Sequence, residues 1–581
     1  MTYRAPLNDM LLALNHGAGL KAAVEAGHYG DFDPDITAAV LEEAGKFATD
    51  VLAPLNKVGD RNGVKLADKK VTTAPGWPDA YKRWTEAGWN AVSGPETHGG
   101  QGLPLAINAA CTEIWSAANV AFGLCPLLTL SAIEALDAHG SQELKDIYLG
   151  KLISGEWTGT MQLTEPQAGT DLGALRTRAE PDGEGGYRLY GSKIYITYGD
   201  HDAAENIVHM VLARLPDAPE GTKGISLFVT AKRRVNDDGS LGEHEAVKPV
   251  GLEHKLGIHA SPTCTMAYEG ARAELVGQPN QGLAHMFVMM NAARLNVGVQ
   301  GVGIAERAYQ QALDYALERR QGRGAFEAAP SLNEGGIFHH PDVRRTLGIC
   351  KANIEAARAI CMATAVAYDL ARKGEDAETR RTAALREQFL TPIAKAWSTD
   401  VGMEVASAGI QVHGGMGFIE ETGAAQHFRD SRIPPIYEGT NGVQAADLAG
   451  RKLGLENGAA LHAIIAEVRE TVAELEDADT LRRQSEHLAA AVDAMEQAGE
   501  WLRARRGSPD ALAGATAFLK LAGDTLGGWY LIKAARADAA REPLARLYAD
   551  QVLSQAPALA HAVMSGAEDL ARLDAQALGA A

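Results

Sequence analysis

The spacing of apolar residues along the chain predicts alternating helical and β-rich regions. Apolar positions recur at intervals of three and four in two early stretches, which indicates helices with a buried face, at residues 36–51 and 105–136. A glycine- and proline-rich stretch between them, residues 94–104, predicts a loop. Residues 34–156 are therefore expected to form a helical domain. The arm before it, residues 1–33, carries a short apolar patch that predicts a helix docked on the body.

The pattern changes near Trp157, where β-branched residues and turn residues become frequent. Residues 187–197 alternate between apolar and polar positions, and residues 224–229 form a mostly apolar run. Both patterns are typical of strands. We therefore expect residues 157–278 to form a β domain.

Long helical patterns return after the β-rich region. Three of them are joined by short turns, which favours an antiparallel bundle within residues 279–455: residues 286–320, 340–372 and 386–409. The alanine-rich residues 456–581 predict an additional C-terminal helical domain. The predicted fold class is mostly α with a central β domain.

Composition and charge narrow the function classes. Acidic residues outnumber basic ones, 74 to 55, and the net charge of -19 disfavours an extended nucleic-acid surface. The five cysteines form no CxxC pair, so we expect neither a metal site nor a disulfide framework. The sequence shows neither a secretory signal nor an apolar run of about 18 residues, so we expect no membrane span and a cytoplasmic location.

Common phosphate-binding motifs are missing from the sequence. It contains no GxxxxGK[ST] loop. Gly298, Gly301 and Gly303 lie inside a helical pattern with no strand before them, which excludes a dinucleotide-binding βαβ unit at this place. Close packing between helices explains these glycines better.

One carboxylate stands in an unusual apolar segment that two prolines stiffen. Residues 433–441 read Ile-Pro-Pro-Ile-Tyr-Glu-Gly-Thr-Asn, so Ile436 and Tyr437 precede Glu438 and Gly439 follows it. A surface glutamate in a loop is one explanation. The apolar neighbours suggest the other, a positioned catalytic base.

Two further segments could bind a ligand through their backbone. Residues 161–171 end a predicted strand and enter a glycine-containing turn, which can hold a flat heterocycle and its phosphates, although a plain loop explains them equally well. Residues 411–418 follow a helix, and their paired glycines allow close approach to the backbone. His413 lies among them, but a histidine beside glycines is more often a structural donor than a catalyst.

Together with residues 429–440, these segments resemble the acyl-CoA dehydrogenase flavoprotein family over about residues 35–453. The resemblance implies dehydrogenation of an acyl-CoA thioester to a trans-2-enoyl-CoA, with Glu438 as the catalytic base and with Arg294 and Gly439 among the substrate-binding residues. One branch of the family places its base just before the arginine that corresponds to Arg294. Here Ala293 occupies that position, so Glu438 is the remaining candidate for the base.

The same resemblance implies that FAD is the cofactor. The residues that match the family's flavin contacts within one chain are Met161, Leu163, Thr164, Gly169, Thr170, Tyr195, Thr197 and Thr440. Those that match contacts made from a neighbouring subunit are Arg319, Gln411 and Gly415. Tyr195 stands where many members have tryptophan. Gly442 replaces a frequent glutamine and Gly322 a frequent aromatic residue, which suggests that the nucleotide end of FAD is held differently.

The N-terminal opening and the C-terminal block resemble a long bacterial subfamily. Its members include 3-(methylthio)propanoyl-CoA dehydrogenases and broad-range fatty acyl-CoA dehydrogenases, and we take 3-(methylthio)propanoyl-CoA as the leading substrate and short- to long-chain fatty acyl-CoA as the alternative. The resemblance further implies a homodimer and an electron-transfer flavoprotein as acceptor. An acyl-CoA oxidase is a second candidate, and a DNA-protecting relative a third that the net charge disfavours. The C-terminal block either regulates the enzyme or covers a surface that tetrameric relatives bury.

Overall fold

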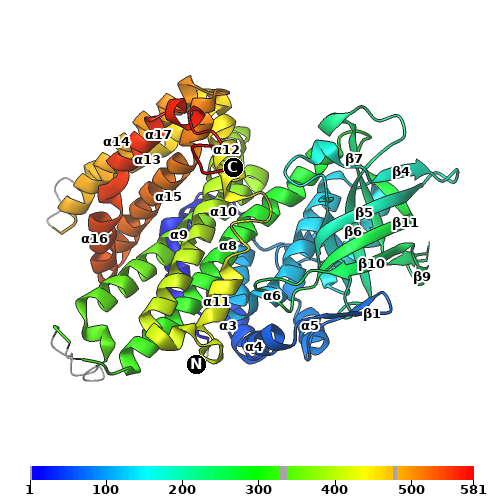
Figure 1. Ribbon diagram of the computed structural model, residues 1–581, viewed down its shortest axis with the longest axis horizontal. Helices are drawn as coiled ribbons and strands as arrows, with labels where there is room; N and C mark the ends of the chain where they lie inside the picture. Colours follow the sequence, from blue (N-terminus) through cyan, green and yellow to red (C-terminus); the bar gives the residue numbers. More distant parts are fainter. Residues whose placement is uncertain (1–2, 237, 323, 327–335, 476–479, 581) are drawn as a thin grey trace. The chain divides into compact units, whose positions relative to one another are not determined.

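The computed structural model describes residues 3–580 except 237, 323, 327–335 and 476–479. The chain divides into two compact units (Figure 1), one comprising Glu43–Asn296 and the other Tyr3–Glu42 with Val297–Ala581. Two helices, α3 (Ile36–Phe47) and α8 (Gly282–Glu318), pass from one unit into the other.

The unit Glu43–Asn296 combines the predicted N-terminal helices with the predicted β domain. Its helices are the π-helical turn η2 (Ala48–Leu52), α4 (Ala53–Asn62), α5 (Trp77–Glu86), α6 (Leu105–His139) and α7 (Gln142–Ser154). Its strands are β1 (Lys65–Ala67), β2 (Lys70–Thr72), β3 (Trp157–Gln162), β4 (Arg178–Pro181), β5 (Tyr187–Thr197), β6 (Asn206–Arg214), β7 (Ile225–Ala231), β8 (Arg233–Val235), β9 (Leu241–His244), β10 (Val247–Leu252) and β11 (Thr263–Val276). The strands predicted at residues 187–197 and 224–229 correspond to β5 and β7.

A seven-stranded sheet forms the core of the β domain. Its strand order is β10-β11-β5-β4-β6-β3, and β7 pairs with both β11 and β6. β3 lies parallel to β6, whereas β5 and β11 form a long antiparallel pair. Every residue of β7 is buried, as is usual for a strand covered on both faces.

Helix α6 corrects the expectation that no segment of the chain is long and apolar enough to cross a membrane. By length and apolar composition it could cross a membrane, although no such segment was anticipated. Its most apolar stretch is wholly buried, as in the core helix of a globular domain. The helix is interrupted at Asn119, whose backbone is not helical (φ -162°) and whose side chain accepts a hydrogen bond from Phe122 N at 3.1 Å.

The other unit is helical. It contains, besides the second part of α8, α1 (Leu7–Leu12), the π-helical turn η1 (Ala13–Gly17), α2 (Leu20–Glu25), α9 (Pro341–Lys373), α10 (Ala377–His413), α11 (Ala424–Ser431), α12 (Asn441–Gly450), α13 (Ala459–Glu474), α14 (Arg482–Ala504), α15 (Pro509–Ala537), α16 (Glu542–Gln551), α17 (Ala556–Met564) and α18 (Glu568–Ala571). Local capping fixes where the long helices begin. Asp376 accepts hydrogen bonds at 2.8 Å from Glu378 N and Thr379 N at the start of α10, and Pro509 opens α15.

Close approach between α8 and α10 explains two of the helical glycines. A Cβ atom at Gly298 would lie 2.4 Å from Ala394 O, and one at Gly301 would lie 2.6 Å from Ser398 O. Only glycine lets the two backbones come so near. The predicted role of these glycines in helix packing is confirmed.

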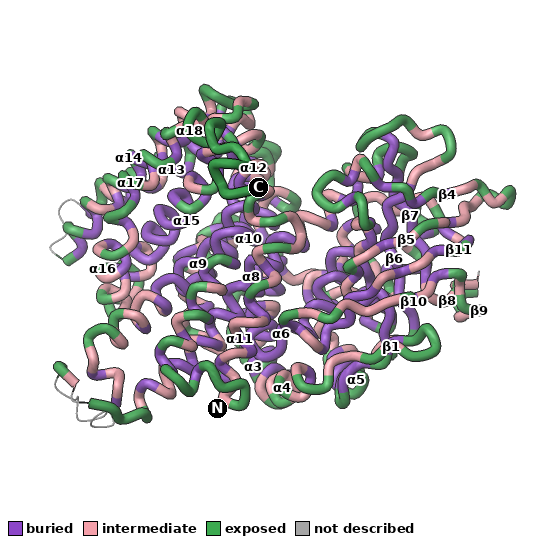
Figure 2. The backbone as a smooth tube through the Cα atoms, viewed as in Figure 1, coloured by how far each residue is buried: buried purple, intermediate pink, exposed green. Residues whose placement is uncertain are grey.

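The C-terminal helices cover the bundle. α15 packs against α9, α10 and α12, and α16 packs against α9. As a result residues 352–369 of α9 are buried on every side, which Figure 2 shows along the middle of the helix. A bundle helix with one face in water would show the usual exposed stripe. Here the C-terminal block occupies that face.

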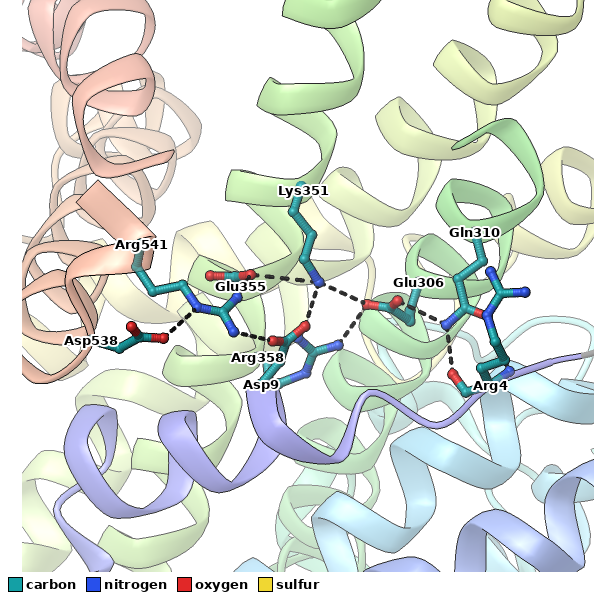
Figure 3. A network of polar contacts seen from close by, with 9 residues as sticks. All are labelled: Arg4, Asp9, Glu306, Gln310, Lys351, Glu355, Arg358, Asp538 and Arg541. Carbon is teal, nitrogen blue, oxygen red and sulfur yellow. Dashed lines mark hydrogen bonds and ion pairs between the residues drawn. The ribbon is translucent and has the colours of Figure 1, made fainter. Parts of the chain in front are cut away.

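A buried ionic network joins the N-terminal arm, the bundle and the C-terminal block (Figure 3). Lys351 on α9 lies 2.5 Å from Asp9 of α1, 3.5 Å from Glu355 and 3.8 Å from Glu306 of α8. Arg541, just before α16, contacts Asp9 at 2.6 Å and Glu355 at 2.7 Å. Burial disfavours the Asp9 carboxylate, but the surrounding cations outweigh it and lower the pKa of Asp9 to about 2.

Candidate active site

The candidate base lies in a loop with an uncommon backbone conformation. Glu438 follows α11, is half-buried, and has a positive φ of 57°, and Gly439 after it has a φ of 84°. A residue with a Cβ atom rarely adopts this left-handed conformation, and at functional sites it is maintained by surrounding contacts. Gln444 Nε2 lies 3.4 Å from Glu438 O and 3.3 Å from Gly439 O, so it supports both carbonyl groups.

Asn441 fastens the Glu438 loop to α10. Its Oδ1 atom accepts a hydrogen bond from Lys395 Nζ at 2.9 Å, and its Nδ2 atom donates to Ala396 O at 3.0 Å and to Asp400 Oδ1 at 2.8 Å. Its backbone N–H also donates to Pro435 O at 3.0 Å, which closes the loop on itself. Lys395 is fully buried, so this contact is well shielded from water.

Tyr437 supports the loop from the side of α8. Its hydroxyl donates to Gln300 Oε1 at 2.6 Å. Burial raises the pKa of Tyr437, and the negative charge of Glu438 raises it further, so the phenol stays neutral. The residue directly before the Glu438 carboxylate is thus a neutral aromatic one.

The predicted flavin-facing turn, within residues 161–171, is held in place by a buried ion pair. Lys193 on β5 lies 2.7 Å from Glu165, and both side chains are almost inaccessible, at 0% and 3% exposure. Lys193 Nζ also donates to Leu163 O at 3.0 Å. Glu165 also accepts hydrogen bonds from the backbone N–H groups of Arg176 at 2.7 Å and Thr177 at 3.0 Å, and from Gln167 Nε2 at 2.7 Å.

These contacts place the turn beside β5. Burial opposes ionisation of Glu165, but the Lys193 charge and the hydrogen bonds outweigh it and lower the pKa of Glu165 to about 2. Ile194 N donates to Thr164 O at 2.9 Å. The half-buried Leu163 and Thr164 are thereby brought next to the strand that carries Tyr195 and Thr197, whereas Gly169 and Thr170 are exposed further along the turn.

A bulge in β5 presents Tyr195 to the outside. The register between β5 and β11 shifts between Cys264 and Met266, and Tyr195 has a φ of 59°. Its side chain is 60% exposed, unusually open for a tyrosine in a central strand. Bulges often re-aim a side chain near a binding site. An exposed flat ring beside Thr164 and Thr197 is suited to cover a planar ligand.

Met161 lies near the chain segment that carries Arg294, a predicted substrate-binding residue. It packs at the edge of a small apolar cluster formed by Leu127 and Leu128 of α6 and Ala293 of α8. Ala293 is fully buried there, so the position of the family's alternative base carries only a methyl group. Arg294, the next residue, hydrogen-bonds Asn291 Oδ1 at 3.3 Å.

The three residues assigned to a neighbouring subunit's cofactor lie together at the ends of α8 and α10. His413 stacks on Tyr315 with ring centroids 4.4 Å apart, and its Nδ1 atom is 2.7 Å from Gly409 O, which supports the structural role expected for this histidine. Arg319 follows Tyr315 by four residues, Gln411 and Gly415 stand two residues before and after His413, and all three are exposed. Asp400, beside the Glu438 loop, and Gln411 are separated by about 17 Å along α10, at 1.5 Å per residue.

Comparison with known families covers most of the chain. Residues 35–156 match the model of the acyl-CoA dehydrogenase N-terminal domain, residues 160–271 that of the middle domain, and residues 280–453 that of the C-terminal domain. Residues 464–574 match a further model, "Acetyl-CoA dehydrogenase C-terminal like". The 3-methylmercaptopropionyl-CoA dehydrogenase of Ruegeria pomeroyi is 46% identical over 538 residues, 91% of this chain and 90% of that protein.

The chain belongs to the acyl-CoA dehydrogenase family. Two solved structures show the same fold at low sequence identity. Caenorhabditis elegans ACDH-11 in complex with C11-CoA has a TM-score of 0.77 at 22% identity, covering 95% of this chain and 92% of that one. A Bacillus anthracis acyl-CoA dehydrogenase complexed with FAD has a TM-score of 0.75 at 21% identity, covering 94% and 90%.

Sequence reasoning missed the residues that support these segments. Lys193, Glu165 and Asn441 stand within or beside the motifs, but the local sequence around a charged or amide side chain gives no sign of its burial. The five cysteines are all buried and none forms a disulfide, and the described residues contain no cluster able to hold a metal ion.

Replacing Lys193 by methionine tests the anchoring of the flavin-facing turn. Lys193→Met leaves Glu165 as an unpaired buried carboxylate, so we expect the free energy of unfolding to fall by about 3–5 kcal/mol. Urea unfolding followed by tryptophan fluorescence measures the change. The matched control is Lys248→Met, which removes a partly exposed pair with Glu269 and is expected to cost about 1 kcal/mol or less. Equal losses in the two variants would contradict an anchoring role.

Proposed function

We propose that the protein uses FAD to oxidise an acyl-CoA thioester between its α and β carbons, giving a trans-2-enoyl-CoA, with Glu438 as the base. The observation that carries the proposal is the Glu438 loop. A half-buried carboxylate is held in a left-handed backbone conformation by Gln444 and Asn441, at the position of the family's base. The rival position is occupied by Ala293.

Glu438 would remove the α-proton of the thioester. That proton is a very weak acid, so its removal requires a positioned base and stabilisation of the carbonyl oxygen as negative charge develops. Asn441, Tyr437 and Gln444 fix the loop, which limits the motion of the carboxylate. The backbone N–H of Glu438 is the donor that we assign to the thioester oxygen.

The residues of the β domain suit a flavin. Tyr195 offers an exposed ring, and the half-buried Thr164 and Thr197 offer hydroxyl groups on the adjoining strand and turn. A relative of the same fold has been solved with FAD, which supports this choice of cofactor. When bound, the flavin supplies the hydride acceptor for the β-carbon. The chain itself supplies binding, orientation and the base.

We assign 3-(methylthio)propanoyl-CoA as the preferred substrate. The support is the Ruegeria pomeroyi relative, which matches nearly the full length of both chains. Fatty acyl-CoA of short to long chain is the alternative, because a thioether and an alkyl chain are nearly isosteric. An apolar pocket separates such chains by only about 1–3 kcal/mol per methylene.

An electron-transfer flavoprotein is the proposed acceptor of the electrons, and oxygen is the alternative for an acyl-CoA oxidase. Release of hydrogen peroxide during turnover would identify the oxidase. The five buried cysteines, none of which forms a disulfide, support a reducing, cytoplasmic location. The net charge of -19 counts against a DNA-protecting role.

A homodimer would complete the cofactor site. Arg319, Gln411 and Gly415 are exposed in one chain, beside two exposed apolar residues, Met416 (51%) and Phe418 (85%). Exposed apolar groups of this kind mark interaction surfaces. The C-terminal helices already cover α9, so that face is closed to a second dimer, which supports a dimer over a tetramer.

Glu438→Gln tests the base. The amide keeps the size of the side chain but cannot accept the α-proton, so flavin and ligand binding should persist while anaerobic flavin reduction by acyl-CoA slows by at least about a thousandfold. Stopped-flow absorbance at the flavin band measures this rate. Reduction at a near wild-type rate would refute the assignment.

The acyl preference is tested by comparing kcat/KM for 3-(methylthio)propanoyl-, butanoyl-, octanoyl- and palmitoyl-CoA. We expect the highest value for the thioether, with butanoyl-CoA close to it because the two chains are similar in shape. An optimum at palmitoyl-CoA would instead select the broad-range fatty acyl-CoA function.

Light scattering coupled to gel filtration tests the assembly. Each chain has a mass of 61.5 kDa, so a dimer would elute with twice that mass. Phe418→Asp should shift it toward the monomer, whereas Leu512→Asp, at an exposed position on α15, should not. A stable tetramer would contradict the proposal.

A further inference from the structure

Gln300 is a fully buried amide in the middle of α8. Its Oε1 atom accepts a hydrogen bond from the Tyr437 hydroxyl at 2.6 Å. Its Nε2 atom is also buried, and it has no hydrogen-bonding partner among the residues that the structure describes. A buried donor without an acceptor destabilises the fold, and an apolar side chain at this place would avoid that loss. The presence of an amide here therefore points to a role for its oxygen.

The Tyr437 hydroxyl is held by this contact. Within the described part of the chain, Gln300 Oε1 is the acceptor that the hydroxyl reaches. Burial raises the pKa of Tyr437, so the phenol keeps its hydrogen and always has one to donate. The bond thus runs in one direction, from Tyr437 to Gln300, and it holds the aromatic side chain against α8.

Tyr437 leads directly into the peptide group that precedes Glu438. That group contains the Glu438 N–H, which the proposed function assigns to the thioester oxygen. The following peptide group contains Glu438 O, which lies 3.4 Å from Gln444 Nε2. The positive φ of 57° at Glu438 lies between the two groups. Side-chain contacts therefore hold the backbone on both sides of the base, through Gln300 before it and Gln444 after it.

Close packing of α8 on α10 fixes where the Gln300 amide stands. Gly298 and Gly301 flank Gln300 in the sequence, and Cβ atoms at these two glycines would lie 2.4 Å and 2.6 Å from carbonyl oxygens of α10. The second attachment of the loop is Asn441, which bonds to α10 itself. The loop is thus attached to two helices whose separation is set by backbone contact, which leaves little room for either attachment to shift.

We propose that Gln300 is a positioning residue for the dehydrogenation. By accepting the hydrogen bond of Tyr437 it fixes the peptide group that carries the Glu438 N–H, and with it the direction of the Glu438 carboxylate. The inference rests on the proposed function, in which Glu438 removes the α-proton. A donor aimed at developing negative charge stabilises the transition state more than the bound substrate. Loss of the Gln300 contact therefore slows proton removal more than it weakens acyl-CoA binding.

A purely structural role for Gln300 has different consequences. The free energy of unfolding would fall and less flavin would be retained, but each flavin-containing molecule would still be reduced at the normal rate. The two roles are separated by rates that are normalised to bound flavin and measured together with the Kd for acyl-CoA.

Gln300→Met is the first test, because methionine keeps the length of the side chain and removes the acceptor. The holoenzyme is reduced anaerobically by whichever of the four acyl-CoA thioesters above reduces the wild type fastest. We expect the rate constant of flavin reduction to fall by about 10- to 100-fold, the effect of a misplacement of about 1 Å, with nearly unchanged Kd for acyl-CoA. The control is Gln310→Met, which removes another buried amide of α8 about 15 Å away. Gln310 bonds to Arg4 and Glu306, so this control should leave the rate unchanged.

Tyr437→Phe supplies the second comparison. Because Gln300 acts through the phenol, Gln300→Met should change the reduction rate by about twofold or less in the Tyr437→Phe background. The double variant should also resist urea at least as well as either single variant, since it leaves neither the hydroxyl nor the amide without its partner. The urea measurement does not depend on activity.

Four results would overturn the proposal: a wild-type rate in Gln300→Met, losses that multiply in the double variant, an equal loss in Gln310→Met, or a raised Kd at a normal reduction rate. A wild-type holoenzyme that none of the four thioesters reduces would instead refute the proposed function, and this inference with it. The wild-type measurement thus separates the two failures.

Discussion

Irregular backbone that is shielded from water must find partners for its N–H and C=O groups, and this constraint governs two segments that carry candidate site residues, one in each unit. The turn after β3 and the loop that carries Glu438 are neither helix nor strand. In the first, Lys193 and Glu165 supply an acceptor for two backbone N–H groups and a donor for a carbonyl. In the second, Asn441 and Gln444 serve the same purpose. Both segments therefore depend on side chains that were not among the predicted site residues.

The same constraint explains the strained conformation of Glu438. A positive φ costs roughly 1–3 kcal/mol for a residue with a Cβ atom, and it persists only where neighbouring contacts enforce it. Asn441 joins the loop to α10 through hydrogen bonds with Lys395, Ala396, Thr399 and Asp400, and Tyr437 joins it to α8 through one with Gln300. Both are long helices of the bundle, so the loop that carries the base is attached to the bundle at two places.

The C-terminal block changes the environment of the bundle. It buries α9 on all sides and is attached to the arm through Arg541, Asp9 and Lys351, a network that would be costly to break because each lost partner leaves a buried charge. The block also forms one wall of a cavity that Thr440 lines as well. The block therefore affects both which bundle surface is free for assembly and what surrounds the Glu438 loop. This favours an integral domain over a detachable one.

The sequence by itself determined the fold class, the strands β5 and β7, the packing glycines of α8 and the motif that contains Glu438, because periodicity, turn chemistry and motif order are local properties of a chain. It could not show that α6 is buried, that Lys193 and Glu165 form an ion pair, or that Arg432 and Glu404 face one cavity. Those facts depend on residues far apart in the chain, such as Asn441 and Lys395. Only the tertiary structure decides which of them meet, because burial and hydrogen-bond partners are set by packing rather than by neighbours in sequence.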